Sequence, residues 1–436
     1  MSIDALKSAI TNGEREKANF RGIKKELTLE IQAALREFKP LDSTVYHENP
    51  IQLIDFFCGA GGTSLGFAAL NRIIPTFRML GGCDINKLSA ESYSHNFGTP
   101  LINQDITEIA YEEGKLEELL ERIGYDPNLP TVLIGCAPCQ GFTSHRKKHW
   151  NEEDDGRNTL ILAFAEIVKK MNPDAIVMEN VPEFLSNKYW KYFETAKRKY
   201  EECGYVVKQS IYNAASFGVP QERFRAVIIG MKKDFILPSS LLEPQEYVTV
   251  RKAIGQLKPL AAGEKDPDDP MHIAILHQKS TLEVIQQVPH NGGNRPAGVG
   301  PACLDRTKGF SDVYGRLSWD KPSITITAYA RNPASGRFSH PEQDRVMTAR
   351  EAAILQSFPY GFEFKGGSCD TFRQIGEAVP PMLAAGIAAN VVIELMSTAP
   401  TAEELSQSVQ AITEPVSSSY SSVIVGIKNR GKAVQK

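Results

Sequence analysis

Short apolar runs that end at glycine- or proline-bounded turns recur between residues 51 and 230. Each run is followed by a segment whose apolar residues repeat at helical spacing, which is the pattern of strand, turn, helix and strand. The predicted strands are 52–57, 77–83, 131–136, 175–179 and 226–229, and the predicted helices are 88–97, 115–123, 160–171 and 191–203. This alternation predicts an α/β fold with a doubly wound, mostly parallel, Rossmann-like sheet.

The rhythm divides the chain into five parts. Residues 1–48 are charged and amphipathic and predict an N-terminal helical extension, and 49–231 form the α/β domain. Residues 232–315 are rich in Pro, Gly and short irregular segments and predict a smaller, loop-rich domain. Helical patterning returns at 348–357 and 380–396, so 316–397 is expected to rejoin the first domain. The Ser/Thr-rich stretch 398–436 predicts a poorly ordered tail.

Composition narrows the class of protein. Hydrophobic residues make up 42% and charged residues 23% of the 436 residues, the formal net charge is −3, and no run of about 18 apolar residues occurs. The N-terminus lacks the apolar core of a signal peptide, and seven scattered cysteines indicate free thiols in a reducing compartment. We therefore expect a soluble, cytoplasmic protein. Its near-neutral charge leaves nucleic acid open as a partner, because binding needs only a local positive cleft.

A glycine-rich turn follows the first predicted strand. Residues 55–66 read DFFCGAGGTSLG and open a helix, where glycines allow close approach to a ligand and the helix start offers free N–H groups. A tight turn without a ligand is the plain alternative. The next strand ends at Asp84, where an acidic residue typically holds ribose hydroxyls, and Asp105 stands after a further short apolar pair. Together these favour a nucleoside-containing cofactor.

The segment GCAPCQGF, residues 135–142, ends another predicted strand. A thiol at this point can act as a nucleophile, because ligands of parallel α/β sheets bind beyond the carboxyl ends of the strands. Most such thiols are core residues. The spacing of Cys136 and Cys139 also permits a zinc or thioredoxin-type pair, although no second ligand pair is visible and we assign no metal.

Three further segments carry candidate chemistry. Glu179 and Asn180 end a strand at the same predicted sheet edge, where partial burial would raise the pKa of the carboxyl and suit it to donate a proton. Arg223 and Arg225 alternate on one face before the strand at 226–229 and could bind a phosphate or a base carbonyl. Taken alone, Glu179 is more often a surface residue, and Arg223 and Arg225 more often belong to a solvated edge strand. The segment 141–156, which contains HRKKHW at 145–150, predicts a mobile loop whose basic half meets phosphates, and a solvated charge run is the plain alternative.

Taken together, these motifs resemble those of the DNA (cytosine-5)-methyltransferase family. The chain carries in order DFFCGAGGTSLG, PCQ at 138–140, ENV at 179–181, QERFR at 221–225, RLSWDKPSITIT at 316–327 and QIGEAVP at 374–380. The resemblance covers about residues 50–395. One departure is Glu377, which stands where the family usually has Asn.

The resemblance implies roles for particular residues. Cys139 would be the nucleophile, Glu179 the proton donor to the base and Arg225 a partner of the cytosine carbonyl, and the wider catalytic set adds Gln140, Asn180 and Arg223. S-adenosylmethionine would be bound by Asp55, Phe57, Cys58, Gly59, Ala60, Gly61, Gly62, Asp84, Ile85, Asp105, Ile106, Pro138, Asn158, Leu160, Glu377, Ala378 and Val379. Residues 232–315 would read the DNA sequence, and the candidate DNA contacts are Arg146, Lys147, Lys148, Arg295, Arg306 and Lys308.

The function implied is transfer of a methyl group to carbon 5 of a flipped-out cytosine in a specific duplex, through a covalent cysteine adduct at C6. The enzyme would act on double-stranded DNA as a monomer, associated with the nucleoid, either alone or beside a separate cognate restriction endonuclease. Two alternatives stay open: methylation of transfer RNA by the same cysteine, and a catalytically silent DNA-binding scaffold.

Overall fold

The computed structural model describes residues 1–40, 49–138, 160–306 and 312–416. Its centre is a seven-stranded sheet with the order β3-β2-β1-β4-β5-β7-β6. The strands β1 to β5 are parallel, whereas β7 runs antiparallel to both β5 and β6. Their bounds are Ile51–Phe56 (β1), Phe77–Cys83 (β2), Leu101–Ile102 (β3), Thr131–Gly135 (β4), Ala175–Asn180 (β5), Val206–Asn213 (β6) and Phe224–Met231 (β7). The predicted doubly wound, mostly parallel sheet is confirmed.

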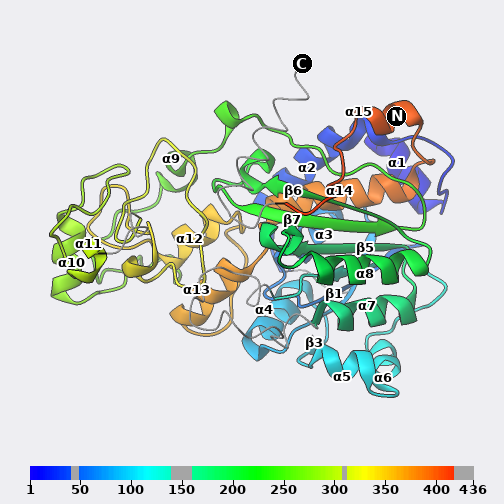
Figure 1. Cartoon of the computed structure of the whole chain (residues 1–436), viewed down its shortest axis with the longest axis horizontal. Coiled ribbons are helices and arrows are strands. Elements are labelled where there is room, and N and C mark those ends of the chain that lie inside the picture. Colours follow the sequence, from blue (N-terminus) through cyan, green and yellow to red (C-terminus); the bar gives the residue numbers. More distant parts are fainter. Residues whose placement is uncertain (41–48, 139–159, 307–311, 417–436) are drawn as a thin grey trace.

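Helices cover both faces of the sheet (Figure 1). One apolar core joins the sheet to α1 (Ile3–Thr11), α2 (Lys24–Arg36), α3 (Gly62–Leu70), α4 (Lys87–Phe97) and α14 (Pro381–Met396). The other core joins it to α5 (Ile106–Tyr111), α6 (Lys115–Arg122), α7 (Leu160–Met171) and α8 (Trp190–Glu202). The N-terminal helices therefore pack directly on the α/β domain. The apolar residues Leu27, Ile31 and Leu35 supply the buried face of α2.

A second lobe with little regular structure projects to one side, at the left of Figure 1. Its helices are η6 (Pro244–Glu246), α9 (Val250–Ile254), α10 (Lys279–Gln286), α11 (Cys303–Arg306) and η7 (Pro333–Ser335). Buried arginines stand beside the apolar side chains that form the core of this lobe. Arg316 donates to the carbonyls of residues 285, 288, 340 and 343, and Arg345 forms a bidentate ion pair with Glu351.

These contacts bear on one predicted boundary. The sequence analysis assigned residues from 316 onward to the returning segment, but Arg316 and Arg345 are fully buried within the loop-rich lobe. Arg316 contributes to the lobe by hydrogen bonds to four carbonyls, and such contacts produce no periodic apolar pattern in the sequence. Residues 323–326 already contact the main domain at Gln221 and Arg223, and α12 (Ala349–Leu355), α13 (Ser368–Glu377) and α14 complete the return.

The C-terminal prediction is wrong for residues 398–416. They form α15 (Ala402–Gln407) and then an extended segment that runs beside the edge strand β6. The Ile412 N–H donates to the Gln209 carbonyl, Val416 pairs with Ser186, and both apolar side chains are buried. Ile412 and Val416 are difficult to recognise in the sequence as packing residues, because the segment around them is rich in Ser and Thr. Residues 417–436 lie outside the described part of the chain.

One stretch, Ser368–Met396, is long and apolar enough to span a membrane, but 94% of its apolar window is buried inside the molecule. It comprises α13 and α14, and α14 packs against α2 and α3. Its apolar length is accounted for by its place in the core.

Candidate active site

Glu179 and Arg225 meet at the carboxyl end of β5. In the antiparallel β5–β7 ladder Glu179 lies opposite Val227, so Arg225 is the diagonal neighbour on the same face. The Arg225 Nε atom lies 2.6 Å from Glu179 Oε1, and the two side chains are only 12% and 10% exposed. The register of the sheet thus builds a nearly buried ion pair at this edge.

The environment holds a proton on Glu179 more readily than water does. Burial raises the pKa of the Glu179 carboxyl, while the positive charges of Arg225 and Arg223 oppose the rise without reversing it. The direction agrees with the prediction for a proton donor.

The loop after β4 is held against the same edge. Asn180 donates from Nδ2 to the Ala137 carbonyl at 3.3 Å and accepts the Val181 N–H at 2.9 Å through Oδ1. Ala137 is buried, and half-buried Pro138 is the last described residue of this loop. The following candidates lie outside the described residues: Cys139, Gln140, Arg146, Lys147, Lys148, Asn158 and Lys308.

Cys136 is a packing residue, as the sequence analysis favoured. Its sulfur lies 3.4 Å from the Thr63 hydroxyl, and burial raises the pKa of the thiol well above its ordinary value. A thiol held neutral in this way is a poor nucleophile and a poor metal ligand.

The glycine-rich turn lies beside this edge, after β1. Phe57 has φ +57°, a conformation that L-residues rarely adopt, and Gly59 has φ +53° with open space where a Cβ would stand. The Gly59 N–H donates to Asp84 Oδ2 at 2.9 Å, and Ile85 beside it is 72% exposed. An exposed apolar side chain, a carboxyl and an open backbone turn therefore converge at one place.

Two glycines of the turn serve packing between chain segments. A Cβ on Gly62 would lie 2.2 Å from the Val379 carbonyl oxygen and 3.2 Å from the Ala378 Cβ. A Cβ on Gly61, where φ is +100°, would lie 2.3 Å from the Phe97 ring. The segment 378–379 thus packs against the turn. Gly61 and Gly62 allow this close packing, whereas Gly59 faces open space.

Several other predicted cofactor residues point into the protein. Asp55 is 1% exposed and accepts the Ser64 hydroxyl at 2.7 Å, and Ser64 is in turn 2.9 Å from the Tyr93 hydroxyl. Cys58, Ala60 and Ile106 are also buried in the core. Sequence reasoning missed Ser64 and Tyr93. In the sequence, Ser64, a small polar residue shortly after the glycines, was the signal that could have indicated this buried network.

Asp105 and Leu160 both stand at helix starts. Asp105 caps α5 by accepting the Thr107 N–H at 2.8 Å and the Thr107 hydroxyl at 2.7 Å through Oδ1. Leu160 is the half-buried first residue of α7.

The two arginines predicted to share a face have different partners. Arg223 is 2% exposed, and its guanidinium donates to the carbonyls of Ile326, Gly376 and Ala378 at 2.9–3.1 Å. It fastens the returning segments to the sheet, since those carbonyls need a buried donor. Arg225 forms the ion pair with Glu179.

Glu377 is the last residue of α13. Desolvation raises the pKa of its carboxyl, Arg373 opposes this, and the neighbouring Asp84 raises it further. Burial likewise raises the pKa of Asp84. Glu377 therefore adds a second carboxyl beside Asp84, where the family's usual Asn would be neutral.

In the second lobe, Arg295 is committed to local structure. Its guanidinium donates to the Pro296 and Val299 carbonyls and pairs with Asp305 at 2.8 Å. These bonds argue against its predicted role as a DNA contact. Arg306 is exposed on α11.

Comparison with known proteins identifies the family. The family model described as C-5 cytosine-specific DNA methylase matches residues 51–392, from the first residue of β1 into α14. The chain belongs to this family. It is thus an enzyme of the DNA (cytosine-5) methyltransferase class, as the motifs predicted.

Two relatives are similar over most of their length. The Type II methylase M.HgiDII of Herpetosiphon aurantiacus is 34% identical over 349 residues, which are 78% of this chain and 94% of that protein. The Type II methyltransferase M1.HphI of Haemophilus parahaemolyticus is 37% identical over 339 residues, or 77% and 85% of the two chains.

Solved structures share the fold. A crystal structure described as that of a DNA modification methyltransferase encoded within a prophage (E. coli) superimposes with a TM-score of 0.59 at 22% identity, covering 79% of this chain and 99% of that one. DNMT2 of Spodoptera frugiperda gives 0.52 at 17% identity, with 79% and 99% covered.

Proposed function

We propose that the enzyme transfers a methyl group from S-adenosylmethionine to carbon 5 of a flipped-out cytosine in a specific DNA duplex, with Cys139 as the nucleophile. The observation that carries this proposal is the nearly buried Glu179–Arg225 pair at 2.6 Å. It stands beside the loop that leads to Cys139 and next to the open turn at Gly59.

The residues at the turn fit the proposed cofactor. S-adenosylmethionine supplies an electrophilic methyl group when bound. Gly59 leaves room for a ligand, exposed Ile85 offers an apolar surface to an adenine ring, and the Asp84 carboxyl suits ribose hydroxyls. Asp105 and Glu377 are carboxyl groups that could hold the adenine amine or face the positively charged sulfonium of the cofactor. Asp55 contributes indirectly by holding the strand end from which the turn starts.

The base is activated by the chain's own groups. The Cys139 thiolate adds to cytosine C6, and the electron pair displaced towards C5 makes that carbon nucleophilic. Glu179 donates a proton to N3 as the addition proceeds, and burial, which raises the pKa of its carboxyl, favours the protonated form that this step needs. Arg225 holds Glu179 in place and can donate to the cytosine carbonyl at O2. C5 would take the methyl group from the sulfonium, which would leave as a neutral thioether. Loss of the C5 proton then expels the Cys139 sulfur as thiolate, and N3 returns its proton to Glu179, which restores the aromatic ring.

Because a stacked base is inaccessible to this edge, the target must leave the duplex, at a cost of a few kcal/mol. We assign duplex contacts to the basic run at 146–148 and sequence reading to the loop-rich lobe. The relatives M.HgiDII and M1.HphI are named as Type II enzymes. We accordingly infer the modification half of a restriction-modification system, acting as a cytoplasmic monomer at the nucleoid, with any cognate endonuclease a separate protein.

The test uses labelled S-adenosylmethionine with duplex DNA or transfer RNA, and compares the native enzyme with Cys139→Ala. We expect label in DNA with the native enzyme and none with the variant. Equal labelling by both would refute the nucleophile, and label in RNA alone would refute the substrate. Bisulfite sequencing of the methylated duplex then locates the target cytosine.

A further inference from the structure

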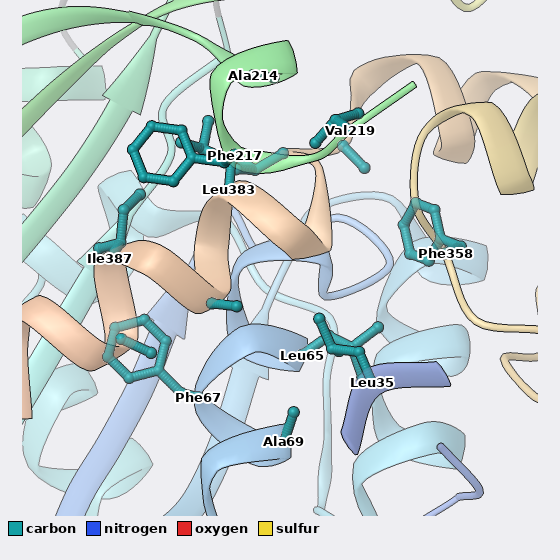
Figure 2. Close-up of a cluster of buried hydrophobic side chains, with 14 of the residues drawn as sticks. Leu35, Leu65, Phe67, Ala69, Ala214, Phe217, Val219, Phe358, Leu383 and Ile387 are labelled. Carbon is teal, nitrogen blue, oxygen red and sulfur yellow. The ribbon is translucent and has the colours of Figure 1, made fainter. Parts of the chain in front are cut away.

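The N-terminal extension, which lies outside the family match at 51–392, touches two segments that lead to the proposed site. Figure 2 shows this junction: Leu35 of α2 lies near Leu65 of α3, while Phe217 and Val219 sit above Leu383 and Ile387 of α14. The side chains that meet there are buried and form part of one apolar core.

One polar side chain bridges the junction. Gln32 on α2 is 7% exposed, and its amide nitrogen donates to the Phe217 carbonyl at 2.6 Å and to the Met382 carbonyl at 3.2 Å. Phe217 ends the short helix η5 (Ala214–Phe217), and Met382 lies in the first turn of α14. A single buried amide thus ties η5 to the start of α14.

The two tied segments lead to different halves of the proposed site. The chain passes from η5 through Gln221 into β7, which carries Arg225. Immediately before Met382, residues 378–379 back the glycine turn, with Val379 against Gly62. Gln32 therefore links the segment that leads to Arg225, on the proposed base-binding side, with the segment that packs against the proposed cofactor turn.

The packing around this amide leaves little freedom. A Cβ on Gly386 of α14 would lie 2.6 Å from the Phe217 ring, so helix and ring approach as closely as a glycine permits. Thr28, one turn before Gln32 on α2, borders the same position. Loss of the amide would remove the Gln32 donor from the Phe217 carbonyl in a closely packed interior, where a buried acceptor needs a donor.

We propose that Gln32 is a positioning residue for methyl transfer, which holds the base-binding and cofactor-binding segments in register. This inference rests on the proposed function. Each half of the site remains intact without Gln32, so binding of either ligand alone is little affected. Transfer depends on the relative placement of the halves, and displacement by about 1 Å can cost up to about 100-fold in rate.

The test compares Gln32→Met, which keeps side-chain length and removes the donor, with Ile31→Val on the same helix, which loses one methylene and leaves both hydrogen bonds. We expect Gln32→Met to lower the single-turnover methylation rate about tenfold. Its dissociation constants for S-adenosylmethionine and for DNA stay within about twofold of native. Amide hydrogen exchange rises at residues 214–219 and 378–384 in Gln32→Met and not in Ile31→Val.

Two results would overturn the proposal. One is a Gln32→Met rate within twofold of native; the other is an equal loss of rate in Ile31→Val. Gln32→Lys, which restores a donor at this position, should recover part of the rate. The native enzyme separates the two hypotheses: if it transfers no methyl group to DNA the proposed function fails, whereas native activity with an unimpaired Gln32→Met refutes the positioning role alone.

Discussion

The buried carboxyl of Asp55 should make the stability of the enzyme depend on pH. Asp55 is 1% exposed, and its Oδ1 atom has no hydrogen-bond partner among the described residues. Desolvation raises the pKa of Asp55 from 3.8 to about 7, although the Ser64 hydroxyl opposes the rise. In the folded state the carboxyl therefore keeps its proton to a higher pH than in the unfolded chain.

The sign follows from proton uptake. Because the folded-state pKa lies above the unfolded one, this stabilising contribution is complete below about pH 4 and is lost as pH rises to about 7. A difference of about 3 pKa units corresponds to about 4 kcal/mol, of which about 2 kcal/mol is lost between pH 5 and 7. Asp55→Asn is neutral at every pH and should lack this loss, so its stability relative to native should improve over that interval.

Urea unfolding of the two ligand-free proteins at pH 5, 6, 7 and 8 measures the effect. Other titrating groups are common to both proteins and cancel in the difference. An unfavourable contact of the new amide would shift that difference by the same amount at every pH. A difference in unfolding free energy that stays flat from pH 5 to 8 would refute the assignment of a raised pKa to Asp55.

Three further predictions concern the ion pairs and the glycine turn. Arg225→Met removes a charge that lowers the pKa of Glu179, so the pH at which single-turnover methylation falls on the alkaline side should rise; an unmoved limb would argue against Glu179 as the proton donor. Gly62→Ala places a Cβ 2.2 Å from the Val379 carbonyl oxygen, so it should lower the free energy of unfolding in urea by about 1–3 kcal/mol and weaken S-adenosylmethionine binding in calorimetry. Gly22→Ala is the control, because a Cβ there meets open space, and it should have neither effect. Glu394→Gln breaks the buried pairs that hold the N-terminal extension and should cost about 3–5 kcal/mol in urea unfolding; a cost no larger than that of the exposed pair mutant Glu201→Gln would contradict it.

The parts of the fold with a strong local pattern could be predicted from the sequence. The strands β1, β2, β4 and β5 are buried apolar runs that end at turns, and they appear within one residue of their predicted bounds. Strand β6 was missed because Lys208, Gln209 and Ser210 interrupt its apolar pattern. Gln209 pairs its backbone with the C-terminal segment, which no local signal reveals.

The roles of individual site residues were harder to predict. Arg223 and Arg225 alternate identically in the sequence, yet one binds three carbonyls and the other pairs with Glu179. The carbonyl partners of Arg223 lie about 100 and 150 positions further along the chain. Spacing alone cannot separate two arginines whose partners are set by the tertiary fold.

The direction of β7 explains why the site can exist at this edge. Glu179 lies near the end of β5, whereas Arg225 lies at the start of β7, and two such residues share an edge only if the strands are antiparallel. In a parallel arrangement the start of β7 would lie at the opposite edge, about 20 Å away along a six-residue strand. The single reversal in an otherwise parallel sheet therefore brings the carboxyl and its arginine together, next to the turn after β1 and the loop after β4.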